Sequence, residues 1–156
     1  MKKILIIILI PFFGRAQLNE VIADSLISYA KQHQGTRYCY GSCAPKKGFD
    51  CSGFVYYVFG HFNIKVPRAS LDYEKQGRII KIDSARKGDV IVFTGTKPKN
   101  RKPGHVGIVI SNPGEELKFI HSSSGKKANG IIITNYATSP YYQSRFIKVV
   151  RVAGVK

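Results

Sequence analysis

The chain has 156 residues, of which 25 are lysine or arginine and 9 are aspartate or glutamate, so that its formal net charge is +16. Such a charge predicts attraction to an anionic partner, either nucleic acid, acidic lipid or an acidic wall polymer, without deciding among them. The sequence has no zinc-finger spacing, no aromatic RNA-binding signature and no basic helix, which argues against nucleic acid as the partner.

The first residues have the composition of an export signal, residues 1–16. Lys2 and Lys3 precede the apolar run Ile4–Phe13, and small residues at Gly14 and Ala16 suit cleavage after position 16. The run is shorter than the roughly 20 apolar residues that cross a bilayer. We therefore expect an exported protein, periplasmic or secreted, without a stable membrane anchor. A buried first helix or an uncleaved anchor is the alternative.

The rest of the chain, residues 17–156, has a length that suits one compact domain with its own hydrophobic core, and we expect it to be a monomer. Apolar residues recur at helical spacing from Leu18 to about Gln34, and Gly35 is a stop signal. This pattern predicts an amphipathic first helix. Residues 35–50 are rich in Gly, Pro, Ser and Cys and predict an irregular loop.

The three cysteines of the chain are Cys39, Cys43 and Cys51. In an oxidising compartment an odd number suggests one disulfide and one free thiol. Cys39 and Cys43 lie four residues apart around Gly41 and Ser42 in a predicted turn, so that the spacing permits a disulfide between them. Cys51 would then be the free thiol. Three reduced thiols are the alternative.

Cys51 is expected in the first turn of a second helix, which continues through the apolar segment 52–59 and is closed by Gly60. Unpaired N–H groups and the positive end of the helix dipole at this position stabilise a thiolate, which predicts a lowered pKa for the thiol. The same N–H groups can form part of an oxyanion hole. A small core residue is the alternative role, so a catalytic cysteine requires a partner.

Beyond the second helix, residues 67–76 predict a short third helix, and the pattern then changes to short runs rich in Val and Ile. Helices followed by an antiparallel sheet of about five strands are the α+β order. We expect the strands near residues 89–94, 106–111, 117–121, 130–135 and 146–152.

His105 and His121 lie on the two strands that flank the turn residues Asn112-Pro113-Gly114. In a hairpin that pairs Ile110 with Glu116, His105 faces His121 on one side of the sheet, with Cβ atoms about 4.5–5.5 Å apart. A shift of one residue would place the two imidazoles on opposite faces.

These residues together predict a catalytic chain in which Cys51 attacks, His105 transfers the proton and His121 orients the ring of His105. The remaining histidines, His33 and His61, lie near helix ends, and we expect structural roles for them. The chain has no CxxC pair and no HExxH helix, so no metal or other cofactor is expected.

Six short segments carry a resemblance to a known family. They are Tyr38-Cys39-Tyr40-Gly41, Phe49-Asp50-Cys51-Ser52-Gly53-Phe54-Val55, Pro67-Arg68-Ala69-Ser70, Lys87-Gly88-Asp89, His105-Val106-Gly107-Ile108 and Phe119-Ile120-His121. In this order they resemble the NlpC-type family of papain-like cell-wall cysteine peptidases. The resemblance implies a reduced papain-like fold, in which the nucleophile helix packs on the antiparallel sheet.

The resemblance also implies a substrate, the stem peptides of peptidoglycan, cut between D-glutamate and a diamino acid through a thioester. It implies that Tyr38 borders the nucleophile and assists the oxyanion hole, and that Asp50 and Ser52 bind a free amino end of the stem. Arg68 and Ser70 complete the expected substrate-binding set. A related wall amidase and a wall-binding protein without catalysis are the alternatives.

The sequence departs from the family pattern at two places. The family usually has small or apolar residues where Cys39 and Cys43 stand, so that a disulfide would shape the rim of the site. The stretch 97–102, which reads KPKNRK, is longer and more basic than the family's usual approach to its histidine. We expect it to guide the anionic wall toward His105. A solvated loop without a role is the alternative.

Overall fold

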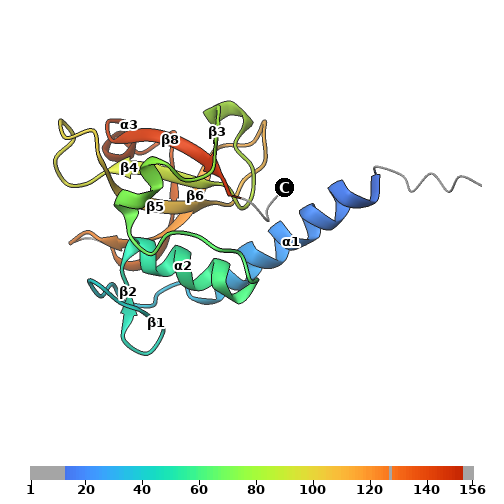
Figure 1. Ribbon diagram of the computed structural model, residues 1–156. Coiled ribbons are helices and arrows are strands. Elements are labelled where there is room, and N and C mark those ends of the chain that lie inside the picture. Colours follow the sequence, from blue (N-terminus) through green and yellow to red (C-terminus); the bar gives the residue numbers. More distant parts are fainter. Residues whose placement is uncertain (1–12, 127, 153–156) are drawn as a thin grey trace, which may run out of the picture.

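The computed structural model describes residues 13–126 and 128–152, with side chains described from residue 20 onward. The predicted export signal therefore lies almost entirely outside the described residues. Helix α1 (Phe13–Gln32) begins earlier than predicted, and helix α2 (Cys51–His61) begins at the predicted cysteine. Helix α2 packs against the sheet and α1 packs against α2 (Figure 1). No helix in the described part of the chain is long and apolar enough to span a membrane.

The predicted α+β class is confirmed, but the antiparallel sheet has six strands, in the order β3-β8-β4-β5-β6-β7. The strand that the sequence did not predict is β3 (Arg78–Ile80), at the edge of the sheet. Two of its three residues are exposed, so it lacks the apolar pattern that marks the other strands. These are β4 (Val90–Thr94), β5 (Pro103–Val109), β6 (Lys118–Ser124), β7 (Asn129–Asn135) and β8 (Phe146–Arg151).

Short elements connect these units. The hairpin of β1 (Cys43–Ala44) and β2 (Gly48–Phe49) lies within the predicted loop and leads directly into α2. The predicted third helix over 67–76 is only a 3₁₀ helix, η1 (Ser70–Glu74), because the chain before it stays extended up to its N-cap. The remaining elements are η2 (Ile82–Ser84) and α3 (Pro140–Gln143).

Two apolar layers cover the two faces of the sheet, as the central strand β4 shows. Val90 and Val92 point into the larger layer, which includes residues of α1 and α2, whereas Ile91 and Phe93 point into a smaller layer on the other face. A strand that is buried on both faces reads as a continuous apolar run, which explains the sequence VIVFT.

The strand directions gather strand termini at one end of the sheet, which we call the site end, and β8 begins there as well. Strand β4 ends there and β5 begins, and β6 ends there and β7 begins. The connection 95–102 and the described residues 125, 126 and 128 project from this end, on the left of Figure 1, where α2 also begins. The β5–β6 turn lies at the opposite end.

Candidate active site

The two histidines meet, but in a different strand register from the expected one. Strand β5 pairs Ile108 with Ile120, and the next hydrogen bond joins the N–H of Ile110 to the carbonyl of Lys118. The expected partner of Ile110, Glu116, instead belongs to a longer turn. Because the register differs by two residues, an even number, His105 and His121 remain on the same face of the sheet.

The contact between the imidazoles runs diagonally across the strand pair. Nε2 of His105 lies 3.0 Å from Nδ1 of His121. The observed register places Gly107 opposite His121, and a Cβ at Gly107 would come within 2.8 Å of Cδ2 of Phe119 and 3.1 Å of Cβ of His121. The missing side chain therefore leaves the space through which His121 reaches His105.

Thr134 on β7 extends this contact to a third group. Its Oγ1 lies 2.9 Å from Nε2 of His121. If each imidazole carries its proton on Nε2, His105 donates to His121 and His121 donates to the threonine hydroxyl, so that both contacts are satisfied. Nδ1 of His105 is then left as an unprotonated base. The contact with Thr134 is therefore compatible with the tautomer that a proton acceptor requires, and it holds the ring of His121 in place.

Aromatic rings surround the imidazoles. The ring of Phe119 lies 4.9 Å from that of His121, and Tyr142 of α3 lies 5.1 Å from His121 and 5.7 Å from His105, centroid to centroid. Burial in this setting lowers the pKa of His105 to about 4. Burial, and then the charge of His105, lower the pKa of His121 well below its ordinary value. Both rings are therefore neutral at neutral pH.

Cys51 occupies the first position of α2, and its side chain lies against β5. The backbone N–H groups of Val106 and Ser52 act on the pKa of its thiol by favouring the thiolate, and Val106 directly follows His105. Cys51 is 9% exposed, at the edge of the core. The structure thus brings the predicted nucleophile beside the strand that carries the predicted base.

The prediction of a lowered pKa for the thiol of Cys51 is wrong. Burial raises the pKa of Cys51, and the carboxylate of Asp50 raises it further. The N–H groups of the helix start and of Val106 act in the predicted direction, but desolvation of the thiolate outweighs them. With a neutral thiol and a neutral imidazole, the proton must transfer while the sulfur attacks.

A protein-family model described as the NlpC/P60 family matches residues 35–151, which include all of these groups. The chain belongs to the NlpC/P60 family. This confirms the resemblance inferred from the six sequence segments, and it agrees with the α+β fold in which α2 packs on the antiparallel sheet.

Named relatives and a solved structure agree with this membership. A γ-DL-glutamyl hydrolase of Bacillus subtilis is 33% identical over 96% of this chain, and a murein DD-endopeptidase/murein LD-carboxypeptidase (MepS) of Escherichia coli K12 is 32% identical over 86% of it. The chain spans 35% of the first relative and 65% of the second. An NLP/P60 lipoprotein-like structure from Staphylococcus aureus matches with a TM-score of 0.71 and 26% identity, over 85% of this chain and 42% of that one.

The NlpC/P60 segment at the start of α2 forms a compact polar cluster. Oδ1 of Asp50 accepts hydrogen bonds from the N–H of Gly53 at 2.6 Å and from Oγ of Ser52 at 3.3 Å. Arg68 binds both carboxylate oxygens, through Nη1 at 3.0 Å and Nη2 at 2.9 Å. The charge of Asp50 is therefore already balanced by Arg68. This pairing weakens the attraction that Asp50 was expected to exert on a free amino end of the stem.

The other two predicted substrate-binding residues lie nearby. Burial, followed by the charges of Cys51 and Asp50, raises the pKa of Tyr38, which shows that its phenol lies close to the nucleophile. Ser70 begins η1, two residues after Arg68. Within the described residues, no hydrogen bond joins the side chain of Ser70 to the polar cluster.

The permitted disulfide between Cys39 and Cys43 is not formed, and all three thiols are free. Phe49 pairs with Tyr38 on one side and with Cys43 on the other, so that the two cysteine-bearing segments flank β2. The thiol of Cys43 instead interacts with Arg68.

Sequence reasoning missed Gly107, Thr134 and Tyr142. Gly107 lies inside a quoted segment, but only the strand register shows which side chain needs its space. Thr134 and Tyr142 have no sequence signal of their own, because they reach the imidazoles through the pairing of β7 with β6 and the packing of α3. Among the described residues, no group of three or more His, Cys, Asp or Glu side chains is placed to hold a metal ion.

Proposed function

We propose that this protein is a cysteine peptidase that hydrolyses amide bonds in the stem peptides of peptidoglycan, at the bond between D-glutamate and a diamino acid. One observation carries the proposal: Cys51 begins α2, which packs against the strand that carries a base, His105, and Nε2 of His105 contacts Nδ1 of His121 at 3.0 Å. Nucleophile, base and orienting group thus come from three elements, α2, β5 and β6.

The reaction follows from this arrangement. The thiol proton of Cys51 passes to Nδ1 of His105 while the sulfur attacks the amide carbon, and the carbonyl oxygen becomes an oxyanion. The carbon–nitrogen bond then breaks, and His105 gives its proton to the leaving amine, which leaves a thioester. Water attacks the thioester, its proton passes to His105, and the carbon–sulfur bond breaks. The proton returns to the sulfur as the carboxylic acid product forms.

The surroundings support both halves of this reaction. The backbone N–H groups that surround the sulfur can also stabilise the oxyanion, to which Tyr38 can add a phenol proton. His121 stabilises the transient imidazolium of His105 less than a carboxylate would, because it is neutral. Rings such as Phe119 and Tyr142 exclude water from the imidazole pair.

The relatives support the choice of substrate and compartment. One is named as a γ-DL-glutamyl hydrolase and another as a murein endopeptidase and carboxypeptidase, so related chains act on γ-glutamyl and murein peptide bonds. A wall substrate lies outside the cytoplasm, which agrees with cleavage of an export signal after Ala16. We therefore include export of residues 17–156 in the proposal.

The test uses purified protein and isolated sacculi, with mass spectrometry of the soluble products. Wild-type protein should release peptides that begin with the diamino acid and leave sugar-bound stems that end in D-glutamate. Cys51→Ala and His105→Ala should release no peptide while keeping the wild-type unfolding temperature. Cys39→Ala is the matched control, because it removes a thiol from a neighbouring segment and should retain most of the activity. Full cleavage by the Cys51→Ala variant would disprove the mechanism.

Product masses also separate the proposal from the amidase alternative. The same cysteine and histidine chemistry serves any amide, so geometry alone does not choose between the two bonds. An amidase would release intact stem peptides and leave free lactyl groups on the sugar. Shortened stems still attached to sugar support the endopeptidase.

A further inference from the structure

Charged side chains are unevenly distributed between the two ends of the sheet. The two connections at the site end, 95–102 and 125–128, contain basic residues and no acidic one. The opposite end is mixed: Glu115 and Glu116 lie in the β5–β6 turn, and Asp83 of η2 lies in a connection that also contains Lys81, Arg86 and Lys87. Strand topology, rather than overall composition, therefore concentrates positive charge beside the active site.

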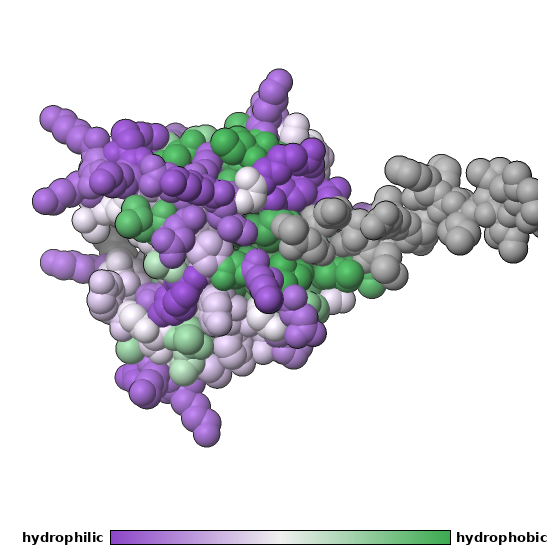
Figure 2. All heavy atoms as spheres, in the orientation of Figure 1, coloured by the Kyte–Doolittle hydropathy of each residue, from purple (hydrophilic) through white to green (hydrophobic). Residues whose placement is uncertain are grey.

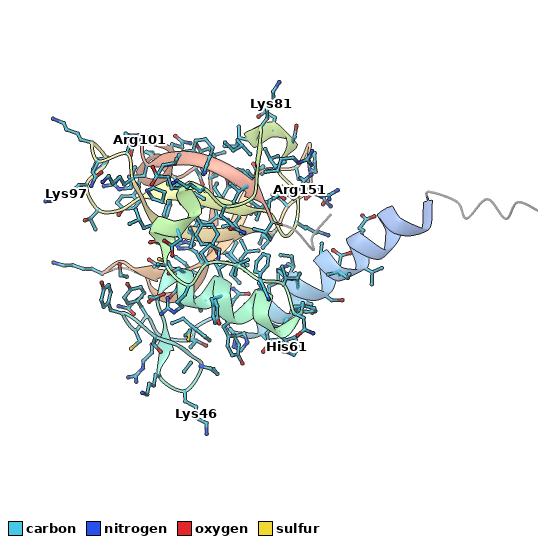
Figure 3. The ribbon with its side chains drawn as sticks, viewed as in Figure 1. Lys46, His61, Lys81, Lys97, Arg101 and Arg151 are labelled. Atoms are coloured by element: carbon cyan, nitrogen blue, oxygen red, sulfur yellow. The ribbon has the colours of Figure 1, made fainter. Side chains whose placement is uncertain are left out.

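Four lysines at the site end are exposed: Lys97, Lys99 and Lys102 before β5, and Lys126 between β6 and β7. We call them the basic rim. Figure 3 shows Lys97 projecting outward from this end, and hydrophilic side chains extend from the same side in Figure 2. The ion pairs found among the described residues join other groups, such as Lys87 with Asp24 and Arg151 with Asp89. The ammonium groups of the rim are thus available to a ligand.

Arg101, which lies between two rim lysines in the sequence, has a structural role instead. Its guanidinium donates to the carbonyl of Phe146 at the start of β8. Arg145 fixes the same loop by donating to the carbonyl of Thr96 at 3.3 Å, with its guanidinium 3.7 Å from the ring centre of Tyr141. The loop is thereby held against the start of β8, and its lysines stay next to the strand that carries His105.

The polar cluster inside the site does not offset this charge. Asp50, the acidic residue nearest the nucleophile, is neutralised by the two contacts of Arg68. The side chain of Arg68 is 35% exposed, so its positive edge remains open to solvent. A substrate that approaches Cys51 from the site end therefore meets positive groups and a neutral pair.

We propose that the basic rim binds the free carboxylates of the wall polymer on either side of the stem peptide being cut, so that the protein prefers carboxylate-rich polymer to amidated polymer. This rests on the proposed function. Ammonium groups on separate loops suit carboxylates that are spaced along a chain. Each lysine ammonium acts as a point charge and, unlike an arginine guanidinium, does not require a fixed planar geometry. Several such contacts raise the local concentration of an anionic polymer and weaken with added salt.

The test compares two variants that lose the same charge. In the rim variant Lys97, Lys99, Lys102 and Lys126 are changed to Gln, and in the control variant Lys31, Lys65, Lys81 and Lys118, all exposed and outside the site end, are changed to Gln. On intact sacculi at low salt, the rim variant should hydrolyse about tenfold more slowly than the wild type. This is the combined effect of four contacts that each contribute under 1 kcal/mol. The control variant should keep the wild-type rate. The loss should be smaller on a short soluble stem peptide.

Chemical treatment of the sacculi identifies the anion. Amidation of their carboxylates should lower the wild-type rate to that of the rim variant, whereas removal of phosphate-containing polymers should leave the difference intact. The proposal would be overturned if the rate difference between the wild type and the rim variant survived amidation but disappeared when the phosphate-containing polymers were removed. Equal losses of rate in the rim and control variants would also overturn it.

Binding measurements separate this inference from the proposed function. Co-sedimentation of the Cys51→Ala protein with sacculi does not depend on turnover. Salt-sensitive binding that the four rim substitutions weaken supports the rim even if no peptide bond is cut. Binding that these substitutions leave unchanged disproves the rim while the peptidase activity can still stand.

Discussion

Gly107 lies opposite His121 across strands β5 and β6, and an added Cβ there would lie 3.1 Å from the Cβ of His121. The imidazole of His121 crosses over this glycine to reach Nε2 of His105. The geometry of the base therefore depends on a residue that carries no functional group.

Gly107→Ala should lower kcat/KM on a stem peptide by about 100-fold, because the methyl group displaces His121 or Phe119 and misplaces His105. The free energy of unfolding should fall by about 1–3 kcal/mol from overpacking. Gly60→Ala is the control, since a Cβ at that exposed position of α2 meets nothing within 4 Å. It should retain full activity and gain up to about 1 kcal/mol in stability. Equal activity in the two variants would contradict the assigned role of Gly107.

Thr134→Val should lower kcat about tenfold while leaving KM nearly unchanged. The loss of one hydrogen bond to Nε2 of His121 costs about 1–1.5 kcal/mol, because the ring of His121 is then held less firmly against His105. Thr134→Ser keeps the hydroxyl and should restore most of the rate. Steady-state kinetics on a defined stem peptide, together with NMR of the imidazole nitrogens, check this prediction. A serine variant as slow as the valine variant would point to packing instead of the hydrogen bond.

Acidification should reduce activity near pH 4 and not near pH 6.5, since burial lowers the pKa of His105 to about 4 and the base stays neutral above that value. The unfolded chain binds a proton at the ordinary histidine pKa, so it holds more protons than the folded chain between these values. Stability should therefore fall as the pH falls through this window, by about 3 kcal/mol for His105.

Two measurements check this pH dependence. Denaturant unfolding at several pH values should show the acid loss, and the His105→Gln variant should show a smaller one. Kinetics on a soluble substrate should give an acid limb close to pH 4. Half-maximal activity at pH 6.5 in a fully folded protein would contradict the lowered pKa.

Arg68→Ala should slow both catalysis and alkylation of Cys51. Without the guanidinium, the carboxylate of Asp50 is unbalanced, and its charge raises the pKa of the thiol further. Stability should fall by about 1–3 kcal/mol as a partly buried carboxylate loses its partner. Arg68→Lys should recover only part of each quantity, because lysine lacks the planar fork. The pH dependence of iodoacetamide modification measures the thiol directly, and an unchanged profile in the alanine variant would argue against this coupling.

The sequence was sufficient for the residues whose chemistry and local pattern agree. Cys51 follows the capping residue Asp50 and starts an apolar helix. His105 lies on a strand rich in Val and Ile, and His121 follows the apolar pair Phe119-Ile120, so their elements could be predicted locally. The edge strand β3 was missed, and the short helix η1 was predicted too long. Neither element has a periodic apolar face.

The pairing register of β5 with β6 and the pKa values of the site could not be predicted from the local sequence pattern. The turn 112–115 is closed by a hydrogen bond from Asn112 to the side chain of Glu115 at 2.7 Å, a contact that no pattern of residue types specifies. That turn shifts the expected pairing by two residues. The thiol pKa depends on how much water the packed fold removes, and here burial outweighs the helix N-terminus.

By itself the sequence determined the family, the order of helices and strands, and the three groups proposed for catalysis, because these depend on residue types and on contacts close in the chain. Only the tertiary structure decided the diagonal contact over Gly107, the hydrogen bond of Thr134, the neutral thiol and imidazole, and the gathering of lysines at one end. Each of these depends on which strands pair and how deeply they are buried. Such relations join residues far apart in the chain, and local physical chemistry does not encode them.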